Sequence, residues 1–130
     1  MKYMLIIVGE EGGWQDVSPE EMKAEMGRWF AYGQELEQAG AHIAGEGLQE
    51  SHTARTVRVS PQGERLVTDG PFAESKEQVG GFYLIECSGD DEALEWAKKI
   101  PLRAGAVEVR PVMDYTQFDP EAAAAHSASA

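Results

Sequence analysis

The chain has a single cysteine, few basic residues and no long apolar run. Cys87 has no partner for an internal disulfide, as is usual for a cytoplasmic protein. Only 11 Lys and Arg residues stand against 23 Asp and Glu, and a net charge of −12 repels both nucleic-acid phosphates and anionic membranes. No apolar stretch approaches the roughly 20 residues that span a bilayer. We therefore expect a cytoplasmic protein that binds neither nucleic acid nor membrane.

Sequence motifs of established chemistry are missing too. The chain has no pair of cysteines, no His-Glu-x-x-His and no phosphate-binding loop. His42 and His52 flank Glu46, but their spacing fits no metal motif, and two surface histidines are the better interpretation. We predict no metal and no cofactor, and we keep His42 as a ligand-binding candidate.

The chain does contain enough apolar sequence for one domain with a core. Of its 130 residues, 42% are hydrophobic and 26% are charged, which are ordinary values for a globular protein. Towards its end the sequence becomes rich in alanine and low in complexity. We predict a domain over residues 1–115 and a low-complexity tail over 116–130.

The best-defined helix is predicted from Pro19 to Ala39. Ser18 is a suitable N-cap with Glu21 three residues later, and Gly40 is a suitable stop. Apolar residues follow helical spacing, and we expect them to form its buried stripe: Met22, Met26, Trp29, Phe30, Gly33 and Leu36.

The remaining pattern predicts short strands and a second helix. Strands are expected at residues 2–8, 41–48, 53–59, 64–68, 81–87 and 107–111, with a turn at 60–63 that joins two of them in a hairpin. A helix is expected near 88–100, with a buried face of Ala93, Leu94, Ala97 and Ile100. This βαββαβ order predicts an α+β fold, the ferredoxin-like sandwich.

The two strands expected at the centre of the sheet are apolar on both faces. Leu5 and Ile6 point to opposite faces of the first strand, and Leu84 and Ile85 do so in the later one. Two helices can cover only one face of a four-stranded sheet. We therefore predict a homodimer in which a second copy of the sheet covers the other face.

Residues 69–72 read Asp-Gly-Pro-Phe and begin the most informative stretch of the chain. Gly70 and Pro71 shape a fixed loop that displays the Asp69 carboxylate, and a charged run and an apolar strand follow. Asp69 is a candidate to bind a ligand or to act as a base, but an Asp here also commonly stabilises a turn. Phe72 is either a pocket wall or, more commonly in such a position, a core residue.

The chain resembles the YCII-related family and, within it, the branch named for its Asp-Gly-Pro-Phe motif. The similarity covers about residues 1–112 and is strongest from 67 to 85. It implies the dimeric α+β barrel version of the ferredoxin-like fold. Some relatives look enzymatic and use a His on the first helix with an Asp before a Pro after the second. Trp29 and Ile100 occupy those positions here, so neither group is present.

Further candidates lie on the first helix and on the second strand. Arg28, Trp29 and Tyr32 would form one wall of a small-molecule pocket, although plain core packing is the more common role of such an aromatic pair. Glu46 would meet Asp69 across the pocket mouth and pair two carboxylates there.

Two functions stay open on these observations. In the first, each subunit of the dimer binds a small organic molecule and runs a cofactor-free proton transfer or elimination, with Asp69 or Glu46 as the base. The alternative is a non-catalytic ligand-sensing or protein-binding module. A regulatory role of that kind is conceivable because some relatives occur beside transcription-initiation factors.

Overall fold

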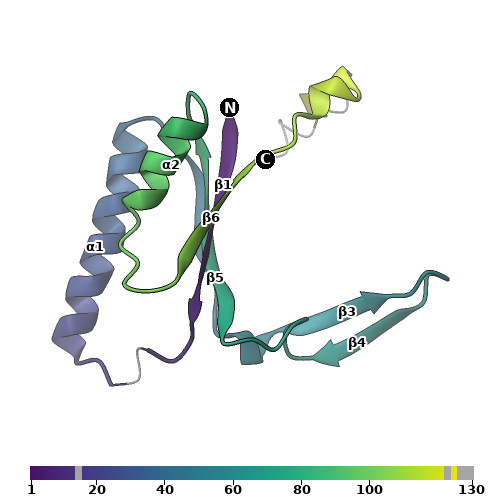
Figure 1. Ribbon diagram of the computed structural model, residues 1–130, viewed down its shortest axis with the longest axis horizontal. Helices are drawn as coiled ribbons and strands as arrows, with labels where there is room; N and C mark the ends of the chain where they lie inside the picture. The colour runs from purple at the N-terminus through teal and green to yellow at the C-terminus, as the bar shows by residue number, and fades with distance from the viewer. Residues whose placement is uncertain (14–15, 122–123, 126–130) are drawn as a thin grey trace.

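The computed structural model describes residues 1–13, 16–121 and 124–125 (Figure 1). Residues 122–123 and 126–130 of the predicted tail lie outside the described residues. Along the chain the elements are β1 (Lys2–Glu10), α1 (Pro19–Gln38), β2 (His42–Gly47), η1 (Ser51–Thr53), β3 (Arg55–Val59), β4 (Arg65–Asp69), β5 (Glu77–Glu86), α2 (Asp90–Lys98), β6 (Ala106–Pro111) and η2 (Tyr115–Gln117), the two η elements being 3-10 turns.

Four strands form the main sheet in the order β2-β5-β1-β6, and each neighbouring pair is antiparallel. Both helices pack on one face of this sheet (Figure 1). The α+β ferredoxin-like sandwich is thereby confirmed. β1 and β5 lie at its centre, as their apolar patterns predicted, and β6 lies at an edge.

The core lies between this sheet and the two helices. Tyr3, Leu5 and Ile85 are almost completely buried there, because alternate residues of β1 and β5 point toward the helices. The intervening residues point the other way, so both central strands are apolar on both faces, as predicted. We call this second side the open face; its apolar residues are Met4, Ile6, Val8, Phe82 and Leu84, all half-buried.

The start of α1 follows the prediction, and its buried stripe follows it in part. Ser18 Oγ accepts a hydrogen bond from the Glu21 N–H at 3.1 Å, which is the expected cap. The expected burial of Met26 and Phe30 is wrong, since 44% and 66% of their surfaces are exposed. Leu36 is buried and Met22, Trp29 and Gly33 are half-buried, as expected. The buried face also contains Tyr32 and Glu25, and arginines neutralise the charge of Glu25, as described below.

Two further apolar residues are misplaced by sequence reasoning. Leu94 was expected on the buried face of α2 but is exposed, and Trp96 is buried instead. The larger indole fills the space above Tyr32, with the two rings edge to face and their centroids 6.1 Å apart. The interpretation of Phe72 as a core residue is also wrong, because 73% of its surface is exposed.

The predicted hairpin is confirmed as β3 and β4, which form a separate two-stranded sheet. We call residues Arg55–Asp69 the arm. It projects from the side of the main sheet that the helices leave uncovered, so the molecule has an L-shaped outline (Figure 1). The Asp-Gly-Pro-Phe loop lies where the arm returns to the main sheet, between β4 and β5.

Candidate functional site

A solvent-open cavity of about 690 Å³ lies at the base of the arm. Three segments build it: the η1 turn, the Asp-Gly-Pro-Phe loop with the charged run behind it, and the start of β5. We call it the base cavity; its lining residues are Ser51, His52, Asp69, Gly70, Pro71, Glu74, Ser75, Lys76 and Gln78. Three of the predicted site residues, Asp69, Gly70 and Pro71, therefore share one cavity.

Backbone contacts hold the Asp-Gly-Pro-Phe loop against the arm. Gly70 has a φ of +94°, a conformation that favours glycine, and its N–H donates to the Ala54 carbonyl at 2.8 Å. Its carbonyl accepts a hydrogen bond from Thr56 Oγ1 at 2.7 Å. These two bonds orient the loop so that Asp69 and Pro71 line the cavity.

Asp69 and Phe72, at the two ends of this motif, both contact arginines of β3. Asp69 Oδ1 lies 3.5 Å from Arg55 Nε, and its side chain is 93% exposed. The guanidinium of Arg58 lies 5.0 Å from the centre of the Phe72 ring. With so much of its surface in solvent, the Asp69 carboxylate is available to the hydrogen-bond donors of a ligand.

The η1 side of the base cavity holds groups that sequence reasoning missed. The Ser51 N–H and Oγ donate to the two Glu11 carboxylate oxygens, each at 2.7 Å, which ties η1 to the end of β1. His52 Nδ1 lies 3.6 Å from Glu50 Oε2. The prediction that His52 is a surface residue is confirmed, since 75% of its side chain is exposed. Nothing in the sequence, however, shows that the arm returns the chain to it at Asp69.

The other predicted catalytic carboxylate lies elsewhere. Glu46 is on β2, opposite Phe82 in the register, and so it belongs to the open face. It does not line the base cavity, which Asp69 does. His42 begins β2 opposite Ile85 and likewise does not line it.

Tyr32 and Trp29, from the predicted aromatic wall, lie in the layer between α1 and the sheet. Tyr32 is buried, its hydroxyl donates to the Trp96 carbonyl at 2.8 Å, and its ring meets that of Tyr83 edge to face at 5.1 Å. Burial raises the pKa of Tyr32 well above its ordinary value of 10.0. Trp29 packs half-buried against the same core cluster. The Tyr32 hydroxyl is thus already occupied within the core.

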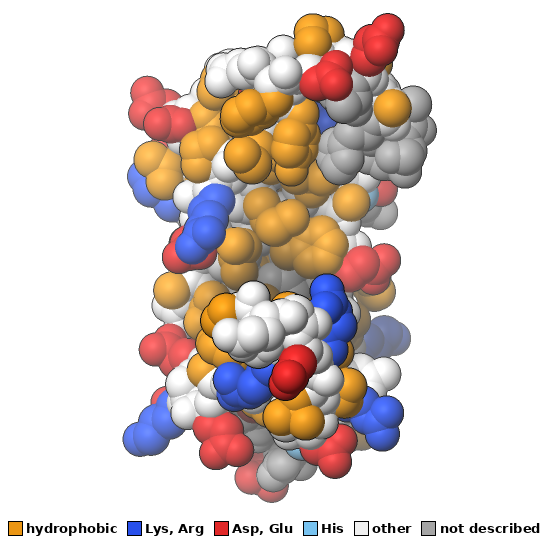
Figure 2. Space-filling view, turned by 90° about the vertical axis from the view of Figure 1, so that its right-hand side faces the viewer, with side chains coloured by type: hydrophobic (Ala, Val, Ile, Leu, Met, Phe, Trp, Pro, Cys, Tyr) orange, Lys and Arg blue, Asp and Glu red, His pale blue; other side chains and the backbone are white. Residues whose placement is uncertain are grey.

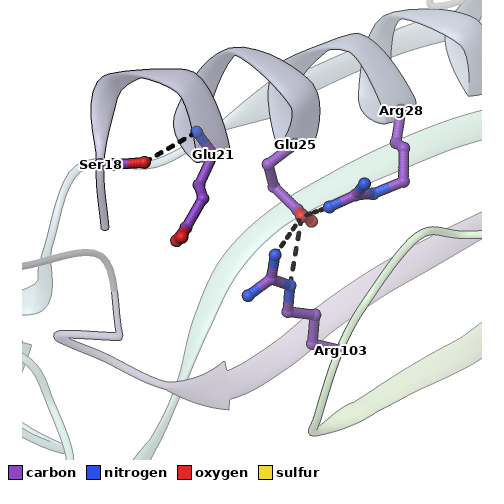
Figure 3. A network of polar contacts seen from close by, with 5 residues as sticks. All are labelled: Ser18, Glu21, Glu25, Arg28 and Arg103. Carbon is purple, nitrogen blue, oxygen red and sulfur yellow. Dashed lines mark hydrogen bonds and ion pairs between the residues drawn. The ribbon is translucent and has the colours of Figure 1, made fainter. Parts of the chain in front are cut away.

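Arg28 belongs to an ion cluster centred on Glu25 (Figure 3). The Glu25 side chain is only 2% exposed, and one of its oxygens accepts from Arg28 and from Arg103, the latter at 3.1 to 3.2 Å. Both arginines keep half or more of their side-chain surface in solvent. The cluster ties α1 to the connection between α2 and β6. Sequence reasoning missed it because its members lie up to 78 residues apart.

A second depression, of about 600 Å³, lies at the N-terminus of α2. The Tyr3 hydroxyl donates a hydrogen bond to Asp90 there. That bond, with burial and the nearby negative charge, raises the pKa of Tyr3 to about 12. The first turn of α2 already carries three acids, Asp90, Asp91 and Glu92, so this end of the helix does not suit an anionic ligand.

Within residues 1–13, 16–121 and 124–125, no group of three or more His, Cys, Asp or Glu side chains is placed to hold a metal ion. None of the helices described there is both long and apolar enough to cross a membrane.

Fold and site together define a small α+β protein with a ferredoxin-like sandwich, a projecting arm and a polar cavity at its base. The model of the YCII-related domain matches residues 1–116. The chain is also similar to an uncharacterized protein of Rhizobium meliloti (strain 1021), with 37% identity over 118 residues, which cover 88% of this chain and 94% of that protein. The chain therefore belongs to the YCII-related family.

Proposed function

We propose that this protein is a homodimer of the Asp-Gly-Pro-Phe branch that binds a small polar organic molecule in the base cavity of each subunit. The observation that carries the proposal is the convergence of three separate segments on one cavity rich in polar groups. Asp69 and Glu74 supply carboxylates, Lys76 an amine and His52 an imidazole. A ligand with both hydrogen-bond donors and an anionic group would find partners for each.

The open face supports the dimer. Figure 2 looks onto this side and shows apolar side chains gathered over it above the projecting arm. Met4, Ile6, Phe82 and Leu84 lie next to one another across the two central strands, and the helices cover only the opposite face. Face-to-face packing of two such sheets would remove this surface from water. For the location we propose the cytoplasm, since Cys87 is a free thiol.

A thermal-shift screen with small acids, amines and hydroxylated compounds tests the binding proposal. A compound present at about 100 times its dissociation constant should stabilise the fold by roughly 2.7 kcal/mol. Asp69→Asn should weaken that stabilisation, whereas Asp91→Asn, an exposed acid on α2, should not. Equal stabilisation of both variants would place the ligand outside the base cavity and refute the proposal.

Proton transfer is the second candidate function, and the His52–Glu50 contact favours it. A carboxylate beside Nδ1 orients an imidazole and supports it as a general base, and His52 lines the cavity. A compound found in the screen would be incubated with the protein and followed by NMR. Turnover should stop in His52→Gln and continue in His42→Gln; a compound that is bound but unchanged supports a ligand-sensing module instead.

A further inference from the structure

The arm exposes apolar side chains on both of its faces. Val57 and Val67 are directly opposite each other on one face with Val59 beside them, and Leu66 lies on the other. Each of these four side chains is more than half exposed. A two-stranded hairpin that packs on nothing is at best marginally stable in water. The ordered arm therefore needs a surface that covers it.

The exposed area of the whole chain is also larger than that of a compact protein of this size. A compact protein of 14.2 kDa is expected to expose about 6,800 Å². This chain exposes 9631 Å². The excess is larger than the roughly 800 Å² per partner that a standard protein interface buries. The arm and the exposed residues 112–121 both contribute to this excess, so the arm accounts for part of it.

The position of the arm favours a second copy of this chain as its partner. The arm leaves the sheet on the open-face side and extends away from it (Figure 1). If two copies pack their open faces together, each arm must pass alongside the body of the other subunit. In a two-fold arrangement both arms then make the same contact, so the interface closes on itself.

Charge complementarity supports the same partner. The arm holds three arginines, at positions 55, 58 and 65, against the two acids Glu64 and Asp69. The chain as a whole has a net charge of −12, so all of the acidic excess lies outside the arm. A slightly basic arm is therefore attracted to the acidic body of a second copy.

We propose that the arm of each subunit packs against the body of the other, with the Val57 and Val67 side chains buried in the contact. This inference rests on the homodimer proposed above and adds a second contact region to it. It also means that the Asp-Gly-Pro-Phe loop, at the base of the arm, lies beside the partner subunit, so that dimerisation would order the base cavity.

Sedimentation equilibrium of the full chain tests the inference. The double variant Val57→Ser/Val67→Ser removes four partly exposed valines from a symmetric dimer, and its dissociation constant should rise roughly 100-fold. Phe30→Ser, at an apolar residue of similar exposure on α1, should leave the constant unchanged. Circular dichroism verifies that each variant keeps its helices.

The outcomes separate this inference from the dimer on which it rests. A wild-type dimer whose dissociation constant is unaffected by the arm variant overturns the arm contact and leaves sheet-to-sheet packing in place. A wild-type monomer overturns both.

Hydrogen exchange provides a second measurement that needs no substitution. Amides of β3 and β4 should be protected in concentrated protein and should lose protection when dilution dissociates the dimer. Protection that does not change with dilution would overturn the inference.

Discussion

Removal of the Glu25 carboxylate should destabilise the fold more than removal of any surface acid. Glu25→Gln keeps the shape of the side chain and abolishes its charge, so the contacts to Arg28 and Arg103 lose their ionic character. A hydrogen bond between charged groups contributes about 1.5–3 kcal/mol. Both arginines are at least half exposed and can be rehydrated, which reduces this figure. We expect a loss of about 1–2 kcal/mol in the free energy of unfolding.

Urea denaturation at a fixed protein concentration measures this loss, and a double-mutant cycle assigns it. Glu25→Gln and Arg103→Met, alone and together, should give a coupling energy of about 1 kcal/mol, above the median for exposed ion pairs. Glu37→Gln, an exposed acid on the same helix, is the control and should change stability by less than about 0.5 kcal/mol.

Glu25→Met adds a further test, because a well-packed apolar residue often replaces a buried ion cluster without loss. We therefore expect Glu25→Met to be at least as stable as Glu25→Gln. A coupling energy of zero between Glu25 and Arg103 would refute the view that the cluster links α1 to the connection before β6.

Three further predictions concern the buried Leu5, the titration of Tyr3 and the close backbone approach at Gly105. Leu5→Ala, at a side chain with no exposed surface, should cost about 3–4 kcal/mol of unfolding free energy in urea, and a loss below about 1 kcal/mol would contradict the described core. Because the pKa of Tyr3 is raised from 10.0 to about 12, its contribution to the free energy of unfolding is complete below pH 10 and is lost as the pH rises to 12. Tyr3→Phe should flatten this part of the stability profile, and an unchanged slope would contradict the raised pKa. Gly105→Ala should lower the melting temperature far more than Gly80→Ala, because a Cβ at Gly105 would lie 2.3 Å from the Val8 carbonyl oxygen while one at Gly80 meets nothing within 4 Å.

Features of the fold that depend on local sequence were predictable. The Ser18 cap, the start of α1 and the β3–β4 hairpin follow from residues next to one another in the chain. The positions of β1 and β5 at the sheet centre follow from apolar residues on both of their faces. The predictions failed where distant residues meet: Glu25 is buried while Met26 is exposed, and the burial of this charge involves Arg103, 78 residues along the chain.

The candidate site likewise contains features that local sequence predicts and features that depend on distant residues. By itself, the sequence determined the α+β class, the order of the elements and the Asp-Gly-Pro-Phe loop with its displayed carboxylate, since all of these depend on short-range backbone preferences and on apolar periodicity. Only the tertiary structure brought Ser51 and His52 of η1 to the Asp69 loop, and separated Glu46 from it. The physical reason is that a hairpin returns the chain close to its starting point, while the direction in which it leaves the sheet depends on packing that no local pattern encodes.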